Sequence, residues 1–488
     1  MKAEESLASA APFVLIEAPA GCGKTHVACD YARGLAPHLG ERRRVLILAH
    51  TNAAVEEFTS RTQDIKSCVR ISTFDSLSLG IVRPYAQALG LSHPIRVGDG
   101  QNRVSPGELS VKARELLDRC PHIATMLVHL HPIVVLDEHQ DASTDQHAIA
   151  MILRGAGARI RAFGDPMQRI FGDEDEGLEW EQIKAQADLV GELSQPFRWS
   201  NNPQLGAWIL DARDRLASGR HIDMSTAPAS VACRVVRGGD IAFGAGQPPD
   251  YAYAIRQMPA GVSALLTART AHMVTLRRAS SNAAHLYEGS QLEHVYTAFD
   301  AFAEKLGNPQ AMSFVLLDLI HLTCTGLTRA YRTRIEQSLN PDQIDPGRQH
   351  LVRPVLDILA AFYAEPTFHS VGKVCRLLLE KTPGFLHIEK PAAFRILSAI
   401  AGTSADAYDE FQDIVQSYKA VSRRPDFAVS TVHRAKGFQF EHVLVSNVSS
   451  SHFPDDDRGR RLLYVAISRC MRSLTILLPQ QGASPLLV

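Results

Sequence analysis

The fold of this chain is decided by one stretch near its start, Glu17-Ala18-Pro19-Ala20-Gly21-Cys22-Gly23-Lys24-Thr25-His26. The apolar run Phe13-Val14-Leu15-Ile16 precedes it and predicts a short buried strand, and the run from Thr25 to Leu35 predicts a helix. A strand, a glycine-rich turn, the triplet Gly-Lys-Thr and a helix are, in this order, typical of a loop that cradles phosphate groups. A glycine-rich turn that binds nothing is disfavoured, because the flanking elements are those that a phosphate loop requires.

Each residue type in this loop has a chemical reason. Gly21 and Gly23 allow backbone conformations that a side chain forbids, so that consecutive N–H groups can point inward at one anion. Lys24 supplies a full positive charge for the β- and γ-phosphates, and the Thr25 hydroxyl is suited to Mg²⁺. The sequence therefore predicts a nucleotide site formed by Ala20, Gly21, Cys22, Gly23, Lys24, Thr25 and His26.

Length and composition limit the class of protein. A chain of 488 residues is too long for one ordinary core, so two or more domains are expected. The eight cysteines include no Cys-x-x-Cys pair, which favours reduced thiols over a zinc site. No apolar run is long enough to cross a membrane, and the start of the chain does not resemble a signal peptide, so we expect a cytoplasmic protein that binds no membrane. Because the net charge is −1, any nucleic acid must bind in a local groove.

Two further apolar runs end in polar turns. Val45–Ala49 predicts a buried strand that leads into His50-Thr51-Asn52, with Asn52 as the expected N-cap of a helix to Arg61. A strand from Val69 leads likewise into Thr73-Phe74-Asp75-Ser76. Because ligands bind at the carboxyl ends of the strands in open α/β sheets, both turns are candidate contact sites.

Two later strands carry candidate catalytic groups. The run Ile133–Leu136 predicts a central parallel strand that ends in Asp137 and Glu138. Asp137 is suited to Mg²⁺, and Glu138 can take a proton from an attacking water molecule. The strand that starts at Arg159 ends near Gln168, which could sense the γ-phosphate, and Phe171, which could either stack on a base or pack in the core.

The order of these motifs resembles the UvrD/Rep/PcrA branch of superfamily-one DNA helicases. Three further motifs of that family are found downstream, at Gln195-Pro196-Phe197-Arg198, Thr431–Glu441 and Arg461–Cys470. The resemblance implies that Phe197 stacks on adenine, that Arg198 and Arg469 reach the γ-phosphate, and that Gly437 and Gln439 lie at the nucleotide. It further implies single-strand contacts by His50, Thr51, Asn52, Thr73, Phe74, Phe171 and His433.

The family also implies an architecture and an activity. We expect an α/β fold with two RecA-like parallel-sheet core domains, as in P-loop NTPases, each with a mainly helical insertion. ATP would be hydrolysed with Mg²⁺ between the two domains, and the polarity implied by the family is 3′-to-5′. The expected boundaries are 1–80 and 124–197 for the first core domain, 81–123 for its insertion, 198–286 and 423–488 for the second core domain, and 287–422 for the accessory insertion.

Several positions depart from the family pattern. Ala18 stands where the strict phosphate-loop pattern has glycine, and no glutamine precedes Phe13 to read adenine. His26 replaces the more usual arginine, and Gln439 replaces a glutamate that meets the ribose. The missing glutamine and His26 predict a site that tolerates GTP or dATP better than a typical member of the family, and Gln439 predicts a weaker grip on the nucleotide.

Three functions remain open from the sequence. The first is an ATP-driven translocase or helicase on single-stranded or partial duplex DNA. The second is a partner-dependent sensor ATPase, because the short insertions resemble the compact UvrD-like subunit of the Gabija anti-phage system, which works with an OLD-family nuclease. The third, a scaffold with an inactive site, is disfavoured because Lys24, Thr25, Asp137, Glu138, Gln168, Arg198 and Arg469 are all present.

Overall fold

The structure is a computed structural model of the whole chain. It describes residues 3–91, 95, 104–171, 178–237, 249–269, 271–281, 283–286, 293–339, 352–389, 391–400, 407, 410–411, 414 and 426–488. The chain divides into two compact units, which are described separately below. The first unit combines Met1–Tyr287 with Pro425–Val488, and the second is Glu288–Arg424.

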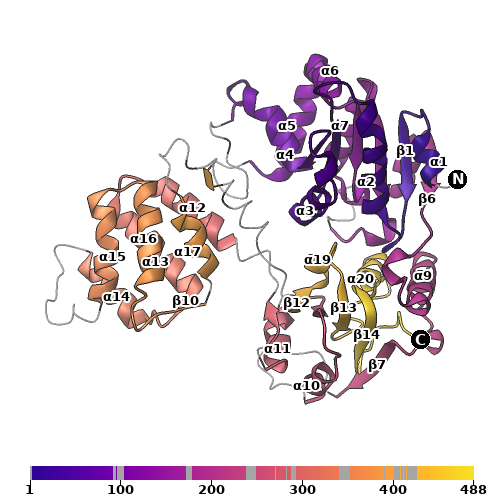
Figure 1. Cartoon of the computed structure of the whole chain (residues 1–488). Coiled ribbons are helices and arrows are strands. Elements are labelled where there is room, and N and C mark those ends of the chain that lie inside the picture. Colours follow the sequence, from indigo (N-terminus) through magenta and orange to yellow (C-terminus); the bar gives the residue numbers. More distant parts are fainter. Residues whose placement is uncertain are drawn as a thin grey trace. The chain divides into compact units, whose positions relative to one another are not determined.

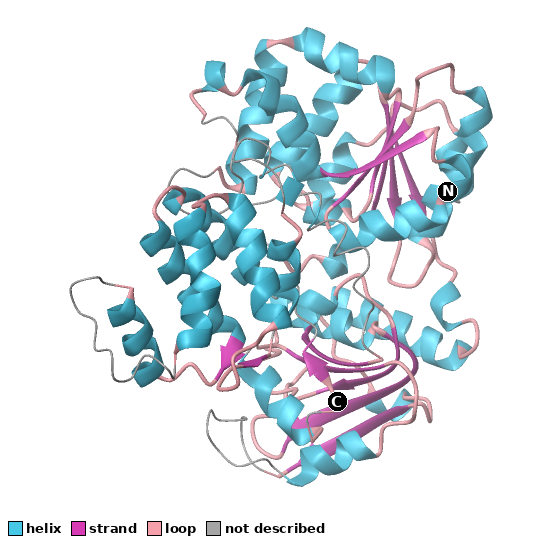
Figure 2. Ribbon diagram, turned by 60° about the vertical axis from the view of Figure 1, so that its left-hand side comes forward, coloured by secondary structure: helices cyan, strands magenta, loops and turns pink. Residues whose placement is uncertain are grey.

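The first unit contains two parallel sheets, drawn as magenta strands in Figure 2. Six strands pair in the order β3-β2-β4-β5-β1-β6 to form the first sheet, and every pairing is parallel. Their bounds are β1 Phe13–Glu17, β2 Val45–Ala49, β3 Val69–Thr73, β4 Ile133–Leu136, β5 Arg159–Gly164 and β6 Leu189–Glu192. The candidate residues that follow these strands therefore lie at one edge of one sheet.

Both faces of the first sheet are covered, which explains why its strands are apolar without alternation. On β1, Phe13 and Leu15 lie in one hydrophobic cluster, whereas Val14 and Ile16 lie in another. The first cluster includes residues of α4 Phe74–Val82, α5 Pro106–Arg119, α7 Thr144–Gly155 and α8 Trp180–Gln186. The second includes residues of α1 Ala3–Ala8, α2 Lys24–Leu35 and α3 Asn52–Arg61, and α6 Pro121–Leu130 adds Ala124 to the first.

Side-chain caps fix where several of these helices begin. The Thr51 hydroxyl accepts a hydrogen bond from Ala54 N at 3.2 Å, so Thr51 is the N-cap of α3 and the expected cap, Asn52, is its first residue. Thr73 caps α4 in the same way through Ser76 N at 3.1 Å. Threonine can take this role because its Oγ1 satisfies an N–H that has no partner in the first helical turn.

The second sheet of this unit has the strand order β7-β14-β13-β8-β12-β9 and is also parallel throughout. Its strands are β7 Val231–Val236, β8 Ser263–Thr267, β9 His285–Leu286, β12 Phe427–Thr431, β13 Phe440–Val445 and β14 Cys470–Pro479. The helices around it are α9 Pro203–Ala217, α10 Pro249–Arg256, α11 Ala271–Ala279, α19 Val432–Ala435 and α20 Asp457–Ile467 (Figure 1). The predicted α/β class with two parallel sheets is thus confirmed.

The second unit is a helical bundle with one short antiparallel pair of strands. Its described elements are α12 Glu293–Lys305, α13 Pro309–Thr323, β10 Cys324–Thr325, α14 Arg329–Ser338, α15 Arg353–Ala364, α16 Phe368–Glu380, β11 His387–Ile388 and α17 Pro391–Ser398. Stacked rings hold its core, because Phe299 lies 4.7 Å from Phe368 and 4.0 Å from Phe411 between ring centroids. The sequence also predicts a helix over Ala407–Val421, most of which lies outside the described residues.

Candidate nucleotide site

The phosphate loop has the left-handed conformations that its glycines make possible. Gly21 has φ 75° and Gly23 has φ 82°, and Gly23 is the N-cap residue of α2. A Cβ atom at Gly21 would lie 2.8 Å from the Cβ of Arg198 and 2.8 Å from the ring of Trp199. Glycine is therefore required here for two reasons, the backbone conformation and the close approach of the segment that carries Arg198.

Lys24 lies at the base of the loop and is 9% exposed. Its Nζ donates a hydrogen bond to the Ala18 carbonyl at 3.3 Å and forms an ion pair with Glu138 Oε1 at 3.3 Å. Ala18 stands where the strict pattern has glycine, and its side chain is fully buried. The contact to Lys24 is made by the backbone carbonyl of Ala18. The lysine therefore joins the ends of β1 and β4.

The two acidic residues after β4 have different surroundings. Burial, followed by the neighbouring Glu138 carboxylate, raises the pKa of Asp137 to about 8. Burial also acts to raise the pKa of Glu138, but Lys24 and Lys436 outweigh it and lower that pKa to about 2. Gln140 Nε2 donates to Glu138 Oε2 at 2.6 Å, which stabilises the ionised form further. Glu138 is thus held as a carboxylate beside the phosphate loop.

Thr25 is half-buried in the first turn of α2, beside Lys24. Among the described residues, no group of three or more His, Cys, Asp or Glu side chains could hold a metal ion. Proteins usually bind Mg²⁺ through one or two carboxylates together with substrate phosphates, and the Thr25 hydroxyl and the Asp137 carboxyl are residue types that suit such a site.

Gln168 connects the two sheets of this unit. It follows β5, is 2% exposed, and its Nε2 donates to Asp165 Oδ2 at 2.9 Å. Its Oε1 accepts a hydrogen bond from Arg469 Nη2 at 3.1 Å, and its carbonyl accepts one from Lys436 Nζ at 2.6 Å. Both cationic residues lie in the segments that build the second sheet, so this one glutamine contacts the second sheet's chain at two points.

Arg469 is 1% exposed, and its Nε donates to the Val465 carbonyl at 2.9 Å. Burial, followed by repulsion from Arg198, lowers the pKa of Arg469 to about 9. Arg198 is half-buried at the other side of the loop, where its N donates to the Gly21 carbonyl at 3.1 Å and its Nη1 to the Ser468 carbonyl at 2.5 Å. Its Nε is buried with no hydrogen-bond partner among the described residues.

The described residues therefore place two guanidinium groups next to the phosphate loop without an ion pair for either of them. Burying a charge without a counter-ion is costly. The Arg198 Nε–H has no hydrogen-bond partner, and neither Arg198 nor Arg469 has a counter-ion within the described residues. Both features are expected of a site that binds an anion. The residues present thus fit the polyphosphate of a nucleotide.

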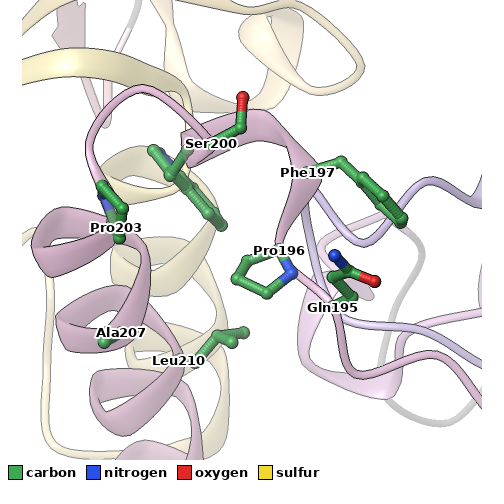
Figure 3. Close-up of a pocket in the computed structure, with 8 residues that line it drawn as sticks. Gln195, Pro196, Phe197, Ser200, Pro203, Ala207 and Leu210 are labelled. Carbon is green, nitrogen blue, oxygen red and sulfur yellow. The ribbon is translucent and has the colours of Figure 1, made fainter.

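Phe197 lies over the loop, because a Cβ at Gly23 would lie 3.1 Å from its Cδ2 atom. The ring is 49% exposed and borders a cavity of about 430 Å³. Figure 3 shows Pro196 between Leu210 of α9 and the side chain of Gln195. His26 lies in the first turn of α2 with its side chain 62% exposed, and its Nε2 is 3.1 Å from Asp30 Oδ2.

Two of the expected DNA-contacting residues come together from different sheets. Phe171, which is 44% exposed, lies with its ring centroid 6.1 Å from that of His433. Lys436 Nζ lies 5.1 Å from the centre of the Phe171 ring and forms an ion pair with Asp141. An exposed aromatic ring beside a lysine and a histidine is suited to a nucleobase and its phosphate.

Among the other expected DNA contacts, Thr51 is exposed, His50 and Thr73 are half-buried, and Phe74 is buried. Phe74 is 1% exposed and belongs to the core, where its ring centroid lies 5.1 Å from that of His50. Burial, followed by Lys436, lowers the pKa of His50 to about 4, so its imidazole is neutral at pH 7. The hydroxyls of Thr51 and Thr73 already cap helices, and the side chain of Asn52 lies outside the described residues.

Gly437 and Gln439 follow α19 on the way to β13. Gly437 is exposed and has φ 85°, so it makes the turn that separates Lys436 from the strand. Gln439 is half-buried one residue before Phe440, the first residue of β13. The described contacts of these two residues do not place them against the phosphate loop.

Comparison with known proteins gives two family matches. Residues 2–173 match the AAA domain family, and residues 426–477 match the UvrD-like helicase C-terminal domain. Together these two matches support a superfamily-one helicase that hydrolyses ATP. The first match contains the phosphate loop and the Asp137-Glu138 pair of this helicase, and the second contains its Lys436 and Arg469.

Comparison of the helicase with curated proteins gives no match. Among solved structures, the Pif1 helicase from Candida albicans is similar with 12% identity and a TM-score of 0.42, over 99% of this chain and 95% of that one. Within the described part of the helicase, no helix is both long and apolar enough to cross a membrane.

Sequence reasoning did not single out several residues that the structure places at this site. Lys436 lies within a quoted motif, Thr431–Glu441, and the Lys-Gly pair of that motif was the signal that could have marked it. Asp165 lies between Arg159 and Gln168, and Tyr464 lies inside the Arg461–Cys470 motif, but no chemical pattern in the sequence distinguishes either residue. Arg213 lies in the middle of α9 and belongs to no motif.

Proposed function

We propose that this helicase hydrolyses ATP in the site between its two parallel-sheet domains and uses the cycle to move along single-stranded DNA. The observation that carries the proposal is the pair of guanidinium groups beside the phosphate loop, of which Arg469 is fully buried and Arg198 half-buried. Neither makes an ion pair within the described residues. Both gain a counter-ion only when an anion such as the γ-phosphate binds.

The remaining groups of the site then take definite roles. Lys24 binds the β- and γ-phosphates and gives up its contact with Glu138, which is free to accept a proton from the attacking water. Gln168 forms hydrogen bonds with both Arg469 and Asp165, and these contacts would change when the γ-phosphate binds. Thr25 and Asp137 would hold Mg²⁺, which neutralises charge on the phosphate oxygens.

Movement along DNA follows from the same contacts. The polyphosphate draws Arg198 and Arg469 toward Lys24, and hydrolysis followed by phosphate release removes that attraction. Phe171 and His433 belong to different sheets, so a change in the approach of the sheets changes the spacing of these two rings. Bases stacked on them would therefore be gripped and released once per ATP. The 3′-to-5′ direction is part of the proposal and rests on the resemblance of the motifs.

The test is an ATPase assay on the purified chain with and without a single-stranded oligonucleotide. We expect strong stimulation by the oligonucleotide in the wild type and no turnover in Lys24→Ala under either condition. Equal wild-type rates with and without the oligonucleotide would count against translocation. Turnover that appears only after a nuclease of the OLD family is added would instead support the partner-dependent sensor ATPase.

A strand-displacement assay tests the direction. Two partial duplexes are compared, one with a 3′ single-stranded tail and the other with a 5′ tail of equal length. We expect displacement only from the substrate with the 3′ tail, and displacement only from the 5′-tailed duplex would reverse the assigned polarity.

A further inference from the structure

A tyrosine from the second sheet holds the backbone of the phosphate loop. The Tyr464 hydroxyl accepts a hydrogen bond from Ala20 N at 2.8 Å and donates one to Asp165 Oδ2 at 3.1 Å. Tyr464 lies in α20 and is fully buried, and Asp165 follows β5 and is also fully buried. The hydroxyl thus links the loop after β1 to the loop after β5, although it belongs to neither.

Arg213 supports this link from α9. Its Nη2 lies 3.0 Å from Asp165 Oδ1 and 3.2 Å from Glu17 Oε1, and the residue is 9% exposed. Glu17 is the last residue of β1 and comes directly before the phosphate loop. The guanidinium therefore neutralises two carboxylates of the first sheet domain and leaves Asp165 Oδ2 free to accept from Tyr464 and Gln168.

We propose that Tyr464 is a positioning residue that sets the nucleotide affinity of the phosphate loop, with Arg213 as its support. The Ala20 amide is the first in the loop, and a fixed direction for it orients the amides that follow toward one anion. Because Tyr464 comes from the other sheet, the loop is held in its binding conformation only while the two sheets are close together. ATP affinity is thereby coupled to domain closure through one hydroxyl group. This inference rests on the proposed role of the loop in binding phosphate.

Tyr464→Phe is the sharpest test, because it removes the hydroxyl and keeps the ring. The matched control is Tyr251→Phe, which removes a hydroxyl from another buried tyrosine near the second sheet, in α10. Each protein is measured in three ways: KM and kcat for ATP at saturating single-stranded DNA, the Kd for a non-hydrolysable ATP analogue, and the Tm without nucleotide.

We expect Tyr464→Phe to raise KM and Kd about tenfold while kcat changes less than threefold. The control should leave KM, kcat and Kd close to those of the wild type. A merely structural role for Tyr464 would instead lower the Tm and the active fraction, and hence the apparent kcat, without changing KM or Kd. That result, or a KM within twofold of the wild type, would overturn the proposal.

Arg213→Lys provides a second variant, which keeps the charge but loses the two-point contact of the guanidinium. We expect a smaller rise in KM, about threefold, and an unchanged KM together with an unchanged Kd would contradict the supporting role. Lys24→Ala distinguishes a failure of the phosphate-loop assignment from a failure of the positioning role of Tyr464. If Lys24→Ala is active, the assignment of the phosphate loop fails; if it is inactive and Tyr464→Phe binds ATP normally, only the positioning role fails.

Discussion

The substitution Arg469→Gln is expected to have very different effects on catalysis and on the stability of the unliganded protein. Arg469 Nη2 contacts Gln168 Oε1 at 3.1 Å, and its guanidinium is fully buried with no carboxylate paired to it in the described structure. Arginines that reach the transferred phosphoryl group contribute about 10³–10⁵ in rate, which corresponds to about 4–7 kcal/mol. We therefore expect kcat to fall by at least about 10³.

Stability should respond differently, because the arginine charge is buried at a cost. A pKa lowered to about 9 corresponds to a penalty of roughly 5 kcal/mol on the charged form of Arg469. The pKa of this base is lower in the folded protein than in the unfolded chain, so the full penalty applies at every pH below about 9, including neutral pH. The side chain makes four hydrogen bonds within the described residues, worth about 0.5–1.5 kcal/mol each, so together they offset roughly 2–6 kcal/mol of that penalty. We therefore expect the Tm without nucleotide to stay close to that of the wild type in Arg469→Gln.

The assay pairs steady-state ATP hydrolysis at saturating single-stranded DNA with thermal unfolding in the absence of nucleotide. The matched control is Arg472→Gln, three residues further along, whose side chain is 64% exposed and pairs with Glu441 at 3.3 Å. The control should retain nearly full activity, because an exposed ion pair contributes little. Hydrolysis by Arg469→Gln within tenfold of the wild type would refute the role of this arginine, and a large drop in its Tm would refute the account of the buried charge.

Three further predictions concern the DNA contacts and the nucleotide base. Phe171→Ala should weaken binding of a single-stranded oligonucleotide by about 1–3 kcal/mol in a fluorescence titration, whereas Phe171→Tyr should retain affinity; equal binding by all three proteins would exclude stacking on this ring. Plotted as log K against log salt concentration, binding should fall with a slope of about −0.7 per neutralised phosphate, and a flat response would count against a groove that follows the backbone. Hydrolysis of ATP, dATP and GTP should proceed at similar rates, because Phe197 can stack on any base; a strict preference for ATP would show that another residue reads adenine.

Local sequence was sufficient for the elements that carry the phosphate loop. The runs Phe13–Ile16 and Ile133–Leu136 are apolar without alternation, and a strand packed on both faces requires that pattern. The positive φ values of Gly21 and Gly23 follow equally from residue type, because glycine has no Cβ to clash. Both features depend on neighbours along the chain, so the sequence alone determines them.

Other properties depended on contacts that no local pattern records. Phe74 was predicted to meet DNA from its place in a motif, yet its ring packs in the core beside His50. Thr51, rather than Asn52, caps α3, because capping is decided by the backbone geometry at the helix start and both residue types are suited to it.

The hydrogen bond between the Ala20 amide and the Tyr464 hydroxyl is the clearest example of a contact that no local sequence pattern predicts. The two residues are 444 positions apart in the sequence, and Arg213, which supports them, belongs to no motif. A tyrosine in a helix is compatible with many surroundings, and only the packing of α20 against the loops of the first sheet brings its hydroxyl to the Ala20 amide. The sequence by itself determined which groups can bind a nucleotide, whereas the tertiary structure decided which of them are buried, paired and held in place, because burial and pairing depend on residues that meet only in the folded chain.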